Sequence, residues 1–240
     1  MEDLDYFLDK YDALPLDTDK YKNSYVGWAL EFFLDETEIL NPCLDITLRL
    51  DLTDAEKNYR DNFQNQYSTF TSFLTWKLLQ ALKKHTPFWW RFIQEKEKWY
   101  QINNTPLYFI IAVGGETRYG EFTINNATKL GWLEFSQLYK NGKDSVLVNP
   151  VLPSDRRYAY RFGQYIANLP SLDFLGFTMH TSRNSTQSFF FFGKRTYDEI
   201  QKRLTVPLAI KFHHANLDIF MIELLVKDYQ IELTKADLFE

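Results

Sequence analysis

The sequence contains a single cysteine, Cys43, in 240 residues. One thiol excludes an intramolecular disulfide and fits a reducing compartment, so we expect a cytoplasmic protein. Three Asn-x-Ser/Thr sequons begin at Asn103, Asn126 and Asn184. In a cytoplasmic protein they would not be glycosylated, and we interpret them as chance.

The sequence also has no excess of basic residues and no long apolar run. Its 27 Lys and Arg residues are outnumbered by 32 Asp and Glu residues, which gives a net charge of −5. We therefore do not expect a nucleic-acid partner. The acidic start, Met1–Asp5, is not typical of a signal peptide, and no apolar run has the length of a membrane span. We expect no association with a membrane.

Two further kinds of site are not indicated. No Gly-x-x-x-x-Gly-Lys-Ser/Thr string occurs, so a phosphate-binding loop of that type is excluded. The four histidines show no recurring pair-plus-carboxylate spacing, so we expect no metal site.

Aromatic residues, in contrast, are abundant, with 21 Phe, 15 Tyr and 6 Trp. This content suits a packed sheet with an apolar pocket.

The pattern of apolar residues predicts one α+β domain with a large mixed sheet and helices against it. Residues 1–24, acidic and polar, are predicted to be an N-terminal extension, and residues 25–240 a single domain. We predict helices over 67–84 and 129–139, the second ended by Asn141–Gly142, and a helix start at a Thr53–Glu56 capping box. Residues 143–157 are predicted to form a loop. The predicted strands are 45–51, 88–93, 98–102, 107–113, 158–166, 174–179, 188–192 and 206–212.

The stretch from Val206 to Asp218 is the most informative part of the sequence. A short apolar strand ends in His213 and His214, and an aspartate, Asp218, follows four residues after the second histidine. The helix predicted after Asp218 would place it at an N-cap, which is an ordinary structural role. A histidine at the end of a rigid strand is suited to act as a general base.

In this stretch and several others the sequence resembles the chloramphenicol acetyltransferase family of CoA-dependent acyltransferases. The family signature is a strand that ends in His-His-Ala-x-x-Asp-Gly, and residues 213–218 match its His-x-x-x-Asp part. Trp28 lies fifteen residues before Cys43, and residues 45–53 are similar to the first strand of the family. Residues 166–174 and 189–194 resemble two later segments. The matches occur in the same order, over roughly residues 25–230.

The resemblance implies a fold, a reaction and a set of site residues. It implies the chloramphenicol acetyltransferase fold, acetyl-CoA as co-substrate without a metal, and chloramphenicol or another hydroxylated small molecule as acceptor. If the acceptor is chloramphenicol, the resemblance also implies a role in antibiotic resistance. In the family the second histidine is the general base, here His214, and the aspartate, here Asp218, supports the turn beneath it. Family members are trimers, in which the histidine of one subunit faces a pocket on its neighbour.

Four further residues are implied with less specific roles. Cys43 aligns with a family cysteine and is expected to line the acceptor pocket, as are Phe177 and Met179. Ordinary core packing would explain the same three residues. Lys194 aligns with a family lysine and is expected to meet the CoA phosphates, although a surface lysine has the same appearance in sequence. His213 is expected to be a structural residue at the strand end, and His85 and His180 have no spacing partner.

The sequence departs from the family pattern at four positions. Ala167 stands where the family has the serine that meets the oxyanion, and Leu30 where it has the arginine that pairs with the aspartate. Ile219 replaces the glycine after the aspartate, and Phe191 replaces a pocket threonine. Loss of one oxyanion donor typically costs about 10²–10³ in rate. Two functions therefore stay open: an O-acetyltransferase, or a weak or inactive relative that acts as a trimeric ligand-binding or scaffold protein.

Overall fold

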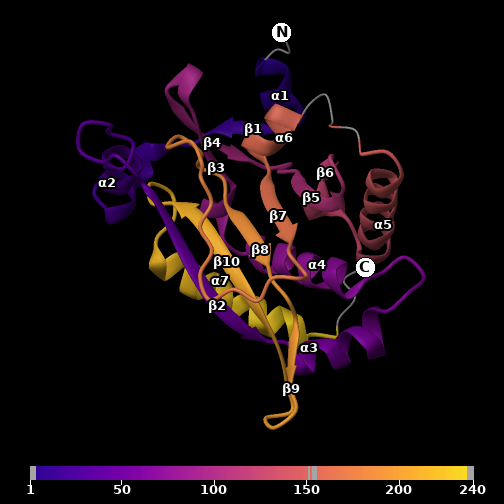
Figure 1. The fold of residues 1–240 in the computed structure, drawn as a ribbon. Coiled ribbons are helices and arrows are strands. Elements are labelled where there is room, and N and C mark those ends of the chain that lie inside the picture. Colours follow the sequence, from indigo (N-terminus) through magenta and orange to yellow (C-terminus); the bar gives the residue numbers. More distant parts are fainter. Residues whose placement is uncertain (1–3, 151, 153–155, 237–240) are drawn as a thin grey trace.

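The computed structural model describes residues 4–150, 152 and 156–236. Within these residues seven strands form one mixed sheet, in the order β2-β10-β8-β7-β5-β6, with β9 paired to β10 (Figure 1). β7 is parallel to both β5 and β8, and the other pairs are antiparallel. The strands are β2 (Cys43–Asp51), β5 (Leu107–Gly114), β6 (Arg118–Ile124), β7 (Gln164–Asn168), β8 (Phe189–Phe192), β9 (Thr196–Asp198) and β10 (Arg203–His213).

Four helices cover one face of this sheet, with α4 and α7 behind it in Figure 1. They are α3 (Thr53–Asn58), α4 (Phe70–Leu82), α5 (Trp132–Val148) and α7 (Ile219–Thr234). The core follows from the alternation along each strand, because successive side chains point to opposite faces. In β10 the helix-facing residues are Val206, Leu208, Ile210 and Phe212, all almost fully buried. Ala209, Lys211 and His213 therefore face the other side.

The N-terminal segment joins a second, smaller sheet of order β1-β4-β3. The remaining helices, α1 and α2 at the N-terminus and α6 before β7, lie at its end of the molecule (Figure 1). The strands are β1 (Ala13–Pro15), β3 (Trp90–Ile93) and β4 (Lys98–Ile102), and the helices are α1 (Leu4–Lys10), α2 (Tyr25–Phe32) and α6 (Arg156–Phe162). Single turns lie at η1 (Thr18–Tyr21), η2 (Tyr59–Phe63), η3 (Thr86–Trp89), η4 (Gln94–Lys96) and η5 (Ala127–Lys129).

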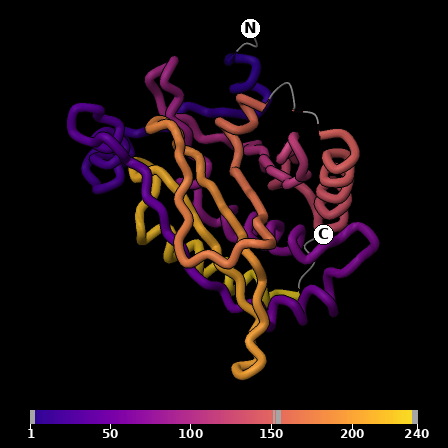
Figure 2. The backbone as a smooth tube through the Cα atoms, in the orientation of Figure 1, coloured from indigo at the N-terminus to yellow at the C-terminus, as the bar shows by residue number. Residues whose placement is uncertain are grey.

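The face of the sheet opposite the helices is crossed by residues 169–188, which connect β7 to β8 (Figure 2). A parallel strand pair needs a crossover connection, and a helix usually supplies it. Here the crossover is irregular, and its side chains Phe174, Phe177 and Met179 pack on the sheet. The prediction of a strand over 174–179 is therefore wrong. Its apolar pattern reflects packing on the sheet face rather than a place within the sheet.

Other expectations also need correction. Helix α3 begins at Thr53, as predicted, but without a capping box: the Thr53 backbone N–H and hydroxyl both donate to Asp51. The strand predicted over 158–166 is α6 up to Phe162, followed by β7. β6 and β9 were not predicted. The 143–157 loop is helical up to Val148 within α5 and again from Arg156, while residues 151 and 153–155 lie outside the described residues, as do 1–3 of the extension.

Helix α5 differs from its predicted end at Gly142 for a packing reason. The helix continues through Gly142 to Val148. A Cβ atom at position 142 would lie 2.3 Å from Cδ2 of Phe122, a residue of β6 that is only 8% exposed. The glycine therefore allows the helix to approach the sheet closely, and it does not mark a helix end.

Candidate active site

His214 lies in the turn between β10 and α7, and hydrogen bonds fix its ring and its backbone. Nδ1 of the ring is 3.1 Å from the Leu217 carbonyl oxygen. Because a carbonyl oxygen can only accept, Nδ1 carries the proton and Nε2 keeps a lone pair. The His214 backbone N–H donates to the Pro42 carbonyl at 2.8 Å. The half-buried imidazole is thus held in the tautomer that a general base at Nε2 requires.

The neighbouring His213 has both ring nitrogens occupied. Its Nε2 donates to the Arg183 carbonyl at 2.8 Å, and its Nδ1 accepts from the Ala215 backbone N–H at 3.1 Å. The side chain is fully buried, and this burial lowers its pKa to about 4. His213 is therefore neutral and has no nitrogen available to a substrate, in agreement with the structural role expected for it.

Asp218 caps helix α7, since its carboxylate accepts from the Met221 backbone N–H at 2.8 Å. It makes no ion pair among the described residues. Leu30, which the resemblance aligns with the family arginine, is buried in an apolar cluster with Trp90, Trp99 and Ala215. Position 30 does lie against the histidine turn, as the resemblance implies, but its side chain gives the carboxylate no positive partner. Ile219 is the first residue of α7 and is exposed.

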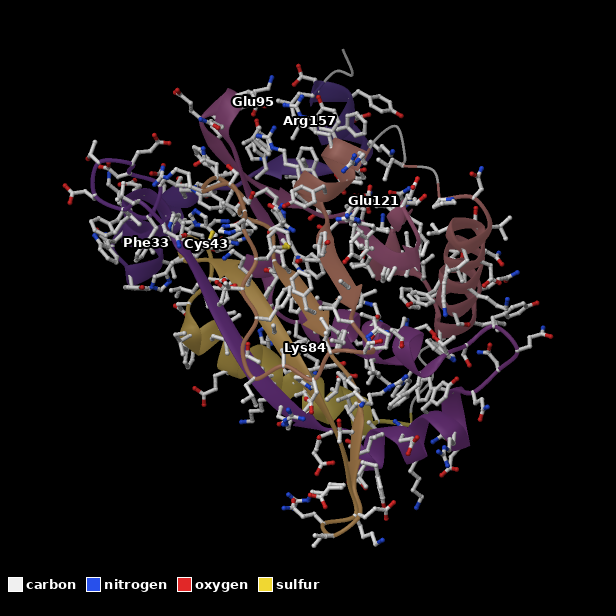
Figure 3. All side chains as sticks on the ribbon, in the orientation of Figure 1. Phe33, Cys43, Lys84, Glu95, Glu121 and Arg157 are labelled. Atoms are coloured by element: carbon white, nitrogen blue, oxygen red, sulfur yellow. The ribbon has the colours of Figure 1, made fainter. Side chains whose placement is uncertain are left out.

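An aromatic residue that the sequence did not single out lies against the histidine. Phe33 follows the end of α2 (Figure 3). The centroid of its ring is 4.2 Å from that of His214. The contact covers part of the imidazole with apolar surface. Nothing in the sequence pattern of residues 25–34 distinguishes Phe33 from its neighbour Phe32, so this contact depends on the tertiary structure.

Cys43 is the first residue of β2 and pairs in register with His213. Its Sγ lies 3.5 Å from the Thr181 hydroxyl, in the crossover segment. Burial raises the pKa of the thiol, so it stays protonated and is not an activated nucleophile. The residue is suited to line a pocket rather than to react.

Phe177 and Met179 pack on the opposite face of the sheet from the helices, against the cluster Ala167, Phe189, Phe191 and Ala209. The centroids of Phe177 and Phe191 are 4.7 Å apart. Ala167 and Phe191 are register partners in the β7–β8 pair, so two of the departures from the family pattern are adjacent. Ala167 is only 4% exposed, and no hydroxyl stands at either position.

The structure separates the predicted site residues into three places. Ala209 pairs with Phe191 in the middle of β10. His214 follows Ala209 by five residues, so about 16 Å of strand separates His214 from the cluster that contains Ala167.

Lys194 follows β8 at the opposite end of β10 from His214, where its backbone N–H donates to Leu172. Its neighbour Arg195, not noted from the sequence, lies over the Phe70 ring. One chain therefore does not assemble all predicted residues around one molecule.

Among the residues that the structure describes, no group of three or more His, Cys, Asp or Glu side chains is arranged to hold a metal ion. Among the helices described, none combines the length and the apolar character needed to cross a membrane.

Comparison with known proteins gives one relative in sequence and several in fold. No protein-family model matches the chain. A chloramphenicol acetyltransferase from Staphylococcus aureus is 22% identical over 209 residues, which is 75% of this chain and 93% of the relative. A solved chloramphenicol acetyltransferase has a TM-score of 0.71 at 15% identity, and the match covers 92% of this chain and 99% of the other. The chain is chloramphenicol acetyltransferase-like.

Other acetyltransferases share the fold. A probable dihydrolipoamide acetyltransferase from Listeria monocytogenes has a TM-score of 0.63 at 13% identity over 90% of this chain and 96% of its own. The cubic core of the pyruvate dehydrogenase multienzyme complex has a TM-score of 0.59 at 14% identity over 92% and 96%. The predicted mixed sheet with flanking helices, of chloramphenicol acetyltransferase-like fold, is confirmed. The sequence relative from Staphylococcus aureus supports an enzyme of the acyltransferase kind.

Proposed function

We propose that this chloramphenicol acetyltransferase-like chain is an acetyl-CoA-dependent O-acetyltransferase with His214 as its general base. The observation that carries the proposal is the hydrogen bond from Nδ1 of His214 to Leu217, which leaves Nε2 free to accept a proton. An alcohol is a poor nucleophile at neutral pH, so a base must remove its proton as it attacks. The hydroxyl oxygen then bonds to the acetyl carbonyl carbon, the carbon–sulfur bond breaks, and the CoA sulfur takes the proton back from the imidazolium.

The proposed acceptor is a small hydroxylated molecule, with chloramphenicol as the first candidate. Cys43, Phe177 and Met179 would line its pocket, and they lie on the same face of the sheet. Lys194 and the adjacent Arg195 would meet the phosphates of acetyl-CoA, and Lys194 is exposed. Asp218 would act as a positioning residue, because the helix that it caps begins directly after the histidine turn. The single buried thiol supports a cytoplasmic location.

The proposed assembly is a homotrimer. In it, His214 of one subunit meets the sheet face of the next subunit that carries Ala167, which is the face opposite the helices. The argument rests on distance: within one chain about 16 Å of strand separates His214 from that face. A hydroxyl bound beside Ala167 would reach the Nε2 of a histidine that comes from another subunit.

A second function is favoured by the departures at the site. The Ala167–Phe191 pair has no hydroxyl to stabilise an oxyanion, and Phe177 covers Phe191. Asp218 has no positive partner among the described residues, since Leu30 occupies the place of the arginine. A catalytically weak or inactive trimer that binds a ligand or serves as a scaffold would tolerate all of these changes.

A thiol-release assay with acetyl-CoA, chloramphenicol and a panel of hydroxylated compounds separates the two functions. Wild type and the exposed control His180→Ala should transfer acetyl groups, while His214→Ala should not. Equal rates for wild type and His214→Ala would reject the proposed base. If no compound is acetylated, thermal denaturation with and without acetyl-CoA tests whether the chain still binds this co-substrate. A ligand that binds only the native state raises the midpoint of denaturation. Light scattering that gives a monomer would reject the trimer and its shared site.

A further inference from the structure

Two cavities adjoin on the side of the sheet that faces away from α4 and α7, and Arg157 and Tyr160 line both. The first has a volume of about 380 Å³ and is also lined by Tyr108 and Arg156. The second, about 290 Å³, lies beside the crossover segment, and Gln187 is among its polar lining residues. Together they have the size range of small-molecule sites, which begins at about 300 Å³.

Arg157 makes no direct ion pair, unlike its two arginine neighbours. Nε of Arg156 lies 3.2 Å from Oε2 of Glu121, and Arg161 binds both oxygens of Glu95, at 2.7 and 2.5 Å. Among the described residues Arg157 makes no ion pair and no hydrogen bond, and it is exposed. Glu95 lines the second cavity, and the pKa of its carboxyl is lowered by Arg161 and, at longer range, by the charge of Arg157. Figure 3 shows Glu95 and Glu121 on either side of it in that view. A guanidinium in this state is suited to bind a carboxylate or a phosphate through two parallel hydrogen bonds.

Gln187 supplies a second polar group without a partner. It is only 2% exposed, it lines the second cavity, and its amide makes no hydrogen bond within the part of the chain that the structure describes. Buried amides in proteins are nearly always hydrogen-bonded. An amide left in this state beside a cavity can donate to the oxygen of a bound molecule.

Besides Arg157, the wall that the two cavities share is the aromatic ring of Tyr160. The Tyr160 ring meets Tyr108 and Tyr165 edge to face, with centroids 5.9 and 6.0 Å apart. Burial raises the pKa of Tyr160, so its hydroxyl stays protonated at physiological pH and does not repel an anion. Tyr160 also packs in the cluster that contains Phe177 and Met179. A ring bound here would therefore lie beside the proposed acceptor pocket.

We propose that Arg157, Gln187 and Tyr160 form a binding site for a small aromatic molecule that carries a carboxylate or phosphate group. Arg157 and Gln187 bind the anionic group, and the ring of the ligand packs on Tyr160 and Tyr108. The site does not require acetyl transfer, so it can be tested on its own. If the chain is an O-acetyltransferase, the site indicates an acceptor that is anionic, in contrast to a neutral one.

Isothermal titration calorimetry of the full chain, without acetyl-CoA, tests this site with four probes. Phenyl phosphate and benzoate carry both a ring and an anion, inorganic phosphate lacks the ring, and benzyl alcohol lacks the charge. Arg157→Gln removes the guanidinium that has no direct ion pair, and Arg203→Gln makes the same change on the distant β9–β10 hairpin. Both positions are exposed, so both variants should fold, and their unliganded melting temperatures check this.

We expect at least one of the two aromatic anions to bind more tightly than inorganic phosphate and benzyl alcohol. Arg157→Gln should weaken that binding about tenfold or more, since hydrogen bonds to charged groups are the strong ones, while Arg203→Gln leaves it unchanged. The tighter of phenyl phosphate and benzoate identifies the anionic group. Binding that Arg157→Gln does not weaken, inorganic phosphate that binds as tightly as the aromatic anions, or no binding of either aromatic anion at millimolar concentration would each overturn the proposal.

Discussion

Lys211 and Asp45 face each other across the β10–β2 pair, with Nζ 3.0 Å from Oδ2. The lysine side chain is 7% exposed and the aspartate 26% exposed. Along β10 the pair stands between Ala209, in the aromatic cluster, and His213, beneath the histidine turn. Thr178 of the crossover segment also donates to this carboxylate. The ion pair therefore joins the edge strand β2 and its neighbour β10 to the segment that covers the sheet.

Asp45→Asn should destabilise the fold, because it leaves the Lys211 ammonium buried without a negative partner. Removal of one partner of a buried pair costs about 3–5 kcal/mol, and the partial exposure of Asp45 reduces the expected loss to about 2 kcal/mol. Urea denaturation measures it. The exposed pair Arg49–Asp173 supplies the control, since Asp173→Asn should change the free energy of unfolding by less than about 0.5 kcal/mol. Equal effects of the two substitutions would contradict this account of Lys211.

His213 predicts how stability depends on pH. Burial lowers its pKa from 6.5 to about 4, so below pH 6.5 the unfolded chain binds a proton that the folded chain does not. The free energy of unfolding should fall as the pH is lowered from 6.5 to 4, by about 1.4 kcal/mol per unit and about 3 kcal/mol in all. Above pH 6.5 this contribution is constant.

Urea denaturation at pH 7 and pH 5 measures this contribution in wild type and in His213→Gln. The variant lacks the titrating group, so its loss of stability between the two pH values should be smaller than that of wild type by about 2 kcal/mol. His180→Gln, at an exposed position, should keep the wild-type loss. The same pH dependence in wild type and His213→Gln would show that another group is responsible.

Gly142→Ala should destabilise the protein even though alanine favours a helix. The gain in helix propensity is about 1 kcal/mol, but a methyl group that overpacks against the buried Phe122 ring costs about 1–3 kcal/mol. Asn141→Ala, at the preceding exposed position, should be neutral or stabilising. If Gly142→Ala raises the melting temperature as Asn141→Ala does, then α5 does not need the close approach at Gly142.

The sequence predicts those parts of the fold whose local pattern and tertiary environment agree. Strand β10 alternates between the helices and the open face, and α4 presents apolar residues at helical spacing, so both are found close to their predicted bounds. The strand predicted over 174–179 is wrong because the apolar residues of this stretch, which is part of the crossover segment, face a sheet that the local pattern does not show. Gly142 was misread because a glycine that permits close packing and one that ends a helix have the same appearance in sequence.

The candidate site, too, is predicted from the sequence only where it does not depend on tertiary contacts. The resemblance places His214 at the end of a strand, but the tautomer of its ring follows from Leu217, a contact within the turn that only the structure provides. Phe33 and Arg157 carry no sequence signal, because their importance depends on what lies beside them in the fold. The resemblance assigned Ala167 to the family serine and Phe191 to a pocket threonine, and the register pairing of these two residues is consistent with both assignments. Whether His214 and Ala167 act on one molecule depends on assembly and stays a prediction.

Ala167→Ser should raise the rate of acetyl transfer if the proposed shared site exists. The new hydroxyl would stand on β7 beside Phe191, on the face that the partner's histidine is proposed to meet. One oxyanion donor contributes about 2.7–4 kcal/mol to the transition state, so even a poorly placed hydroxyl should give about a tenfold increase in kcat.

Ala209→Ser is the matched control, because Ala209 is buried in the same cluster but lies on β10 and not at the position of the family serine. A gain in Ala167→Ser alone supports the acetyltransferase. Folded variants that bind acetyl-CoA with no gain in either would favour the ligand-binding or scaffold function, with Phe191 and Leu30 as further obstacles to catalysis.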